Sequence, residues 1–188
     1  RPWPQESTSG ELLFDGLVHA IGVPWGFSCL SSLAAMAAST DDAKRGVALW
    51  MYGLGLVAML TCSAIYNTLW WTSWHNFLVC LDKSMIFVMI AGTYTPFVGI
   101  VLQEWVYHMH MLCFIWTVAF LGMALTIFAA LTCQGRPARA AQEKRLTLVA
   151  NCMYLGLGWS ALMIVGPLSL HANTESIKWM VFGGILYS

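Results

Sequence analysis

The chain has 188 residues and no formal net charge, and 59% of its residues are hydrophobic while 10% are charged. A water-soluble domain carries about 25% charged residues, so an ordinary protein core cannot absorb this apolar excess. The balanced charge gives no sign of a nucleic-acid partner. Because the apolar residues come in long blocks, lipid is the expected solvent, and the fold class is all-α, a polytopic transmembrane helix bundle.

Residues 1–10 are polar and contain proline, and we expect them to form a tail. Five apolar blocks follow that are long enough to cross a bilayer, for which a helix needs about 20 residues, and a sixth block is shorter. The predicted spans are Gly16–Ala38, Val47–Trp71, Phe77–Leu102, Met109–Cys133, Leu146–Leu170 and the partial span Ile177–Ser188. A helix that ends inside a bilayer leaves carbonyls unsatisfied. We therefore expect a piece of a longer protein, cut at both ends, in which residues 11–188 form one transmembrane domain.

The short loops between the blocks force consecutive helices to run antiparallel. The loop at 134–145 is the most basic one, with Arg136, Arg139, Lys144 and Arg145. Since basic loops stay on the cytoplasmic side, this loop, the loop at 72–76 and the N-terminus are predicted to be cytoplasmic.

Two further patterns predict packing rather than chemistry. The six cysteines show no C-x-x-C spacing, and we expect them to pack as small hydrophobic side chains. Gly22 and Gly26 have the spacing of a helix-contact motif, which predicts close packing inside the bundle.

Polar residues in the first two spans stand out, because such groups are costly in a membrane and mark functional sites. The first block opens with Glu11, Asp15 and His19, spaced four apart and therefore on one helix face. The second block ends with Ser63 and Asn67, again four apart, so that Ser63 could also bond a carbonyl of its own helix.

The third span adds a charge at the same depth. Asp82 lies about 8 Å along its helix from the loop at 72–76, and Lys83 follows it. Both side chains could instead reach back to the membrane surface. The convergence of three helices at one depth predicts a polar pocket in the cytoplasmic third of the bundle.

Four segments resemble a known family. Asp82–Phe97 reads DKSMIFVMIAGTYTPF and is similar to the hemolysin III signature, an Asp and a Ser followed by IAGTYTPF. Ser63–Asn67 reads SAIYN and resembles the family's S-x-x-Y-H segment. Glu11–Gly22 resembles its opening segment, and Gly183–Tyr187 reads GGILY and resembles its G-G-x-x-Y. Their order and spacing fit nearly the whole chain, which therefore resembles the hemolysin III / progestin and adipoQ receptor family.

The resemblance implies a seven-helix bundle with a cytoplasmic N-terminus and a zinc ion near that side. In the family, zinc is held by a His at the end of the second helix and an H-x-x-x-H on the seventh, and its bound water attacks a lipid amide. Ser63 and Asp82 match the catalytic positions beside that water, whereas the His position is Asn67 and the seventh helix lies outside this sequence. Some relatives are described as receptors for lipid-like or protein hormones, and bacterial ones carry a pore-forming, haemolytic label.

One hypothesis is a zinc-dependent lipid amide hydrolase or a lipid- or hormone-sensing receptor. Because a carboxamide is a poor zinc ligand beside imidazole, His19 or His75 would then replace the ligand missing at Asn67. The plain alternatives are that His75 is an exposed loop residue and that His19 bonds Asp15 or Ser63.

A second hypothesis is a metal-free relative that keeps a polar pocket for binding, with Asp82 paired to Lys83 or to the histidine of the first span. A third is transport or pore formation, since Pro24, Pro96 and Pro167 interrupt three spans and broken helices can line a pathway. Membrane lipid is the expected partner, together with a lipid-like ligand. Whether the protein is an enzyme, which membrane holds it and its oligomeric state stay open.

Overall fold

The structure is a computed structural model that describes residues 9–69, 72–133 and 140–172, and also residues 174, 175, 177, 178 and 182. Its elements in chain order are α1 (Ser9–Ala38), α2 (Ala43–Thr68), α3 (His75–Pro96), the π-helical turn η1 (Phe97–Val101), α4 (His108–Thr132), α5 (Ala140–Trp159) and α6 (Ala161–His171). These described residues contain helices and no strand, which confirms the all-α prediction.

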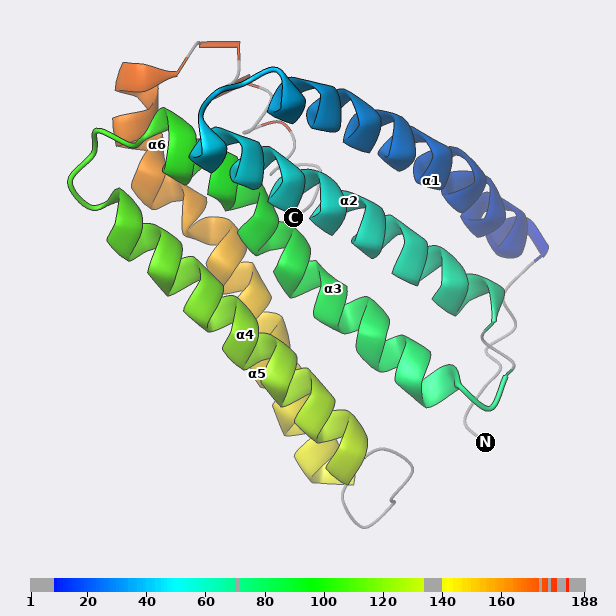
Figure 1. Cartoon of the computed structure of the whole chain (residues 1–188). Coiled ribbons are helices and arrows are strands. Elements are labelled where there is room, and N and C mark those ends of the chain that lie inside the picture. The colour runs from blue at the N-terminus through cyan, green and yellow to red at the C-terminus, as the bar shows by residue number, and fades with distance from the viewer. Residues whose placement is uncertain are drawn as a thin grey trace.

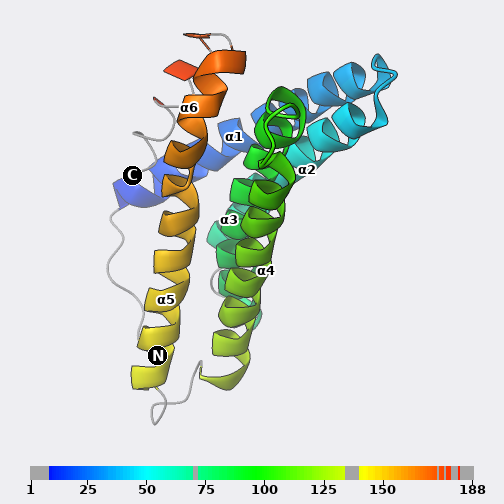
Figure 2. The same ribbon diagram turned by 90° about the vertical axis from the view of Figure 1, so that its left-hand side faces the viewer.

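The helices are arranged in the order of the chain (Figure 1). Each long helix packs on the next, and α3 also contacts α5. Figure 2 shows α5 and α6 following one another beside α4. Because directions alternate, the starts of α1, α3 and α5 and the ends of α2 and α4 lie at one end of the bundle, here called the His75 end. That this end faces the cytoplasm stays a prediction.

Five described segments are long and apolar enough to cross a membrane, in agreement with the five complete spans predicted from the sequence. They are Leu13–Ala38, Ala43–Thr68, His75–Val101, His108–Thr132 and Ala141–Leu170. The sixth predicted span, Ile177–Ser188, lies outside the described residues apart from positions 177, 178 and 182.

The starts of two helices differ most from the predicted boundaries. α1 already begins at Ser9, inside the predicted tail, and α5 begins at Ala140, inside the predicted loop. The sequence AAQEKR at the start of α5 consists of strong helix formers. The helix therefore extends beyond the apolar block, because these residues favour helical backbone even though they are not apolar enough for the membrane interior.

The fifth predicted span is two helices that meet at Ser160. Pro167 lies inside α6 and does not end it. At the junction Ser160 N–H donates to Gly156 O at 2.9 Å, and the Tyr94 hydroxyl of α3 donates to Leu157 O at 2.8 Å. Leu157 O also accepts from the N–H and the hydroxyl of Ser160, so Tyr94 adds a donor from α3 to a carbonyl that is already satisfied within its own helix.

Pro96 has a different effect, because the π-helical turn η1 follows it directly. Proline has no backbone N–H and its ring crowds the preceding turn, which disturbs the regular ladder of helix bonds. Leu102 N–H accordingly bonds Phe97 O, five residues back, at 3.1 Å.

The apolar core lies across α3, α4, α5 and α6. Phe87, Ile115 and Leu168 are each 1% exposed or less. Gly122 of α4 leaves room for the Phe87 ring, because a Cβ at Gly122 would overlap that ring. α3 and α4 can therefore approach closely only with glycine at this position.

The packing prediction for the first span is confirmed, whereas of the cysteines Cys133 is buried and Cys113 and Cys152 are exposed. Gly22 and Gly26 both face Leu60 of α2, so their motif serves contact inside the bundle. All six cysteines are free.

Candidate functional site at the His75 end

A hydrogen bond between two candidate membrane spans joins α1 to α2 at Asn67, the position that the resemblance assigns to a metal ligand. Asn67 Nδ2 lies 2.7 Å from His19 Nε2, and both side chains are half-buried. Since an amide nitrogen only donates, His19 Nε2 accepts and the ring proton sits on Nδ1. That Nδ1 is buried without a partner among the described residues. His19 thus bonds Asn67, and neither of the partners predicted for it, Asp15 and Ser63.

His75 is not the exposed loop residue that the sequence suggested. It is the first residue of α3 and is half-buried. Its ring centroid lies 5.8 Å from that of Tyr66, the residue before Asn67. Its Nδ1, like that of His19, is buried without a partner in the described part of the chain.

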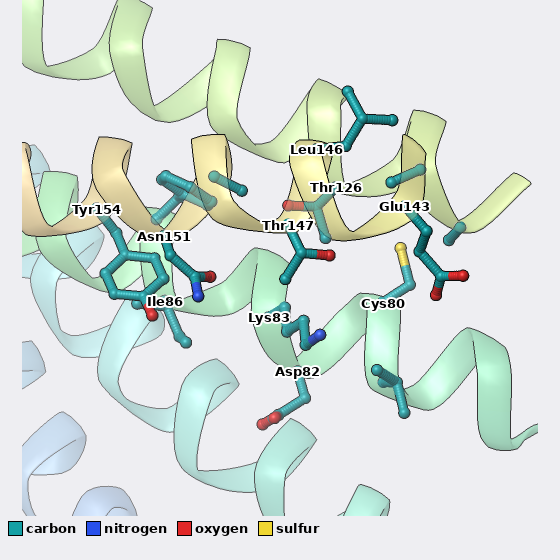
Figure 3. Close-up of a pocket in the computed structure, with 15 residues that line it drawn as sticks. Cys80, Asp82, Lys83, Ile86, Thr126, Glu143, Leu146, Thr147, Asn151 and Tyr154 are labelled. Carbon is teal, nitrogen blue, oxygen red and sulfur yellow. The ribbon is translucent and has the colours of Figure 1, made fainter. Parts of the chain in front are cut away.

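Asp82 lies on α3, which packs against α2, and its side chain points away from α5 (Figure 3). Neither Lys83 nor His19 forms an ion pair with it within the described residues. Ser63, four residues before Asn67 on α2, is half-buried and makes no side-chain hydrogen bond in the same part of the chain. The predicted self-bond of Ser63 to its own helix is therefore not observed.

A cavity of about 350 Å³ lies on the other side of α3, between α3, α4 and α5. Asp82 and Lys83 line it from α3 and Glu143 from α5 (Figure 3). Its walls also carry the polar side chains of Thr147 and Asn151. Asp82 therefore belongs to both the junction of α1, α2 and α3 and this cavity.

Reasoning from the sequence missed the contribution of α5. Glu143, Thr147 and Asn151 are spaced four apart, so they share one helix face, and all three line the cavity. The same spacing had singled out Glu11, Asp15 and His19 in the first span. It could have found the α5 face too, but Glu143 lay in a predicted loop.

Five spanning helices with a polar junction and an adjoining cavity define a multi-pass α-helical membrane protein. The chain belongs to the Haemolysin-III related family, whose model matches residues 11–188. The family suggested by the sequence motifs is thereby confirmed.

Three named relatives fit this assignment. "Hemolysin-3 homolog" of Bacillus subtilis (strain 168) is 28% identical over 181 residues, which cover 96% of this chain and 78% of the relative. "Hemolysin-3" of Bacillus cereus is 26% identical, with 95% and 75% covered. "Monocyte to macrophage differentiation factor" of Homo sapiens is 27% identical over 79% of this chain and 57% of its own length. No solved structure matches the chain.

The family implies zinc, and the described residues do not fit it. Nowhere among them do three His, Cys, Asp or Glu side chains gather as a metal would need. His19 Nε2, the nearest imidazole nitrogen to the family's ligand position, has its lone pair engaged by the Asn67 amide. A structural or catalytic zinc ion needs at least three protein ligands, so these residues alone do not make a zinc site.

Proposed function

We propose that this chain is a metal-free, lipid-binding member of its family. The observation that carries the proposal is the 2.7 Å bond between His19 and Asn67. It gives the imidazole of α1 a protein partner at the position where relatives hold metal, and an amide there is a poor zinc ligand. The junction of α1, α2 and α3 therefore keeps polar side chains but lacks the histidine that would bind zinc at position 67.

The ligand class follows from where these polar groups lie. The junction and the cavity are inside predicted spans, where membrane lipid is the molecule at highest concentration. Polar groups at that depth are expensive unless they meet a partner. An amphiphile can satisfy them with its headgroup while its chains stay in the bilayer.

A zinc-dependent lipid amide hydrolase is the second candidate. It is favoured by the buried imidazole nitrogen His75 Nδ1, which has no partner in the described residues, and by Asp82, which has no ion pair there. In that case the remaining ligands come from residues outside the described ranges, and Ser63 and Asp82 would act beside the metal.

Metal content of the complete encoded protein, purified in detergent from zinc-supplemented cells, separates the two. We expect no bound zinc, and we expect Asn67→His to gain it because imidazole replaces a carboxamide. Asn151→His is the matched control, with the same change outside the junction, and should gain none. About one zinc per chain in the unchanged protein, lost in His19→Ala or His75→Ala, would overturn the metal-free proposal and identify the substitute ligand.

A further inference from the structure

Three charged side chains line the cavity between α3, α4 and α5, and the carboxylate of Asp82 is turned away from the other two (Figure 3). Lys83 of α3 and Glu143 of α5 both line it (Figure 3). Within the described residues neither of them forms an ion pair. A charged side chain at or inside a span is costly without a partner, so a ligand that carries both signs would satisfy both Lys83 and Glu143.

The two charges are ordered along the helices. Glu143 is in the first turn of α5, within about 5 Å of its start, whereas Lys83 lies about 12 Å into α3. Because α3 and α5 both start at the His75 end, the negative charge is the outer one and the positive charge is the deeper one.

Apolar side chains line the cavity beyond the charges. Ile86 and Phe87 follow Lys83 on α3, and Ala150 lies almost two turns past Glu143 on α5. From the His75 end inward, the lining therefore presents the Glu143 carboxylate, then the Lys83 ammonium, then apolar side chains together with the polar Asn151.

We propose that this cavity binds the headgroup of a zwitterionic glycerophospholipid with a terminal amine, of the phosphatidylethanolamine type. Such a lipid has the complementary order: ammonium outermost, phosphate next, acyl chains deepest. Glu143 would accept hydrogen bonds from the ammonium and Lys83 would donate to the phosphate. A cavity of about 350 Å³ has room for a headgroup, and the chains would continue into the bilayer. A fatty acid would satisfy Lys83 alone and leave Glu143 unpaired.

This inference rests on the proposed lipid binding and names its headgroup. The test is native mass spectrometry of the complete encoded protein in detergent, titrated with dioleoyl phosphatidylethanolamine or with dioleoyl phosphatidic acid, which lacks the amine. We expect the ethanolamine lipid to bind more tightly. Glu143→Gln should weaken it about tenfold, because a charge-assisted bond is lost, and leave phosphatidic acid binding no weaker. Lys83→Gln should weaken both lipids.

Two matched controls carry the same charge changes away from the cavity. Glu104→Gln lies in the segment between η1 and α4, at the opposite end of the bundle, and Lys144→Gln is exposed beside Glu143. Both should bind like the unchanged protein, and thermal unfolding in detergent verifies that each variant folds.

The outcomes separate the two proposals. Equal binding of both lipids, unchanged in Glu143→Gln and Lys83→Gln, would overturn the headgroup assignment while lipid binding stands. An effect of Lys144→Gln equal to that of Lys83→Gln would overturn it too, since surface charge would then explain the binding. If neither lipid binds, lipid binding itself fails.

Discussion

α1 and α3 are held in the bundle in different ways. Of the most apolar 18-residue window of each span, 6% is buried in the first and 39% in the third. α1 packs mainly on α2, whereas α3 contacts α2, α4 and α5. Leu13 and Phe14 on α1 are 75% and 68% exposed, which costs little where lipid tails replace water as the solvent.

The comparison teaches that a helix in lipid can be held in place with little of its surface buried. α1 is positioned by two glycines against Leu60 and by the bond from His19 to Asn67. α3 is positioned by interdigitated apolar side chains and by the Tyr94 hydroxyl. Changes in the packing of α3 should therefore cost more stability than changes in the contacts of α1.

The largest effect is expected for Gly122→Ala. The new Cβ would overlap the buried Phe87 ring, which must move or push α4 away. Overpacking of this kind destabilises by about 1–3 kcal/mol. Thermal or denaturant unfolding in detergent measures the change.

Gly16→Ala on α1 is the matched control for that substitution. No atom lies within 4 Å of a Cβ built at Gly16, and alanine favours a helix over glycine by up to about 1 kcal/mol. Equal loss of stability in Gly16→Ala and Gly122→Ala would contradict the packing account, because it would indicate a general intolerance of alanine.

An intermediate effect is expected for Tyr94→Phe. The change removes a hydroxyl that donates to Leu157 O at 2.8 Å and lies 3.0 Å from Ser160 Oγ. The hydroxyl and the backbone N–H of Ser160 both donate to Leu157 O, so the carbonyl keeps two partners. A loss of about 1 kcal/mol is expected in the same unfolding measurement.

Tyr107→Phe provides the comparison for Tyr94→Phe. Tyr107 is 61% exposed, just before α4, and its change should leave stability unaltered. No difference between the two variants would mean that the helix break at Ser160 needs no support from α3.

The smallest effect is expected for the polar contact of α1. A double-mutant cycle with His19→Ala and Asn67→Ala should give a coupling energy of about 0.6 kcal/mol, typical of interhelical hydrogen bonds in membranes. The pair His19→Ala and Asn151→Ala is the control and should be additive, since α1 and α5 are not packed together. Additivity of the first pair as well would mean that the bond does not hold α1.

Much of the fold was predictable, because each spanning helix is specified by its own block of apolar residues. Predicted and observed ends of α4, for example, differ by one residue at each end. The break at Ser160 was not predictable in this way. Pro167 is the stronger local signal, yet the chain breaks where Tyr94, 66 positions earlier, can bond the freed backbone.

The site was predictable in part. His19, Ser63, Asn67 and Asp82 could be named because polar residues are rare in apolar spans. Their partners could not be named. The bond of His19 to Asn67 spans 48 positions, and the face of α5 that carries Glu143 meets α3 across a cavity that α4 also lines.

The sequence by itself determined that the chain crosses a membrane, how many complete spans it has and which family it belongs to. Hydropathy and short motifs are local properties, and lipid enforces helices wherever a block is long enough. Only the tertiary structure decided that His19 meets Asn67, that Asp82 lies between a polar junction and a cavity, and that Lys83 shares the cavity with Glu143. Such contacts depend on how helices distant in sequence pack, and no single helix encodes its partner.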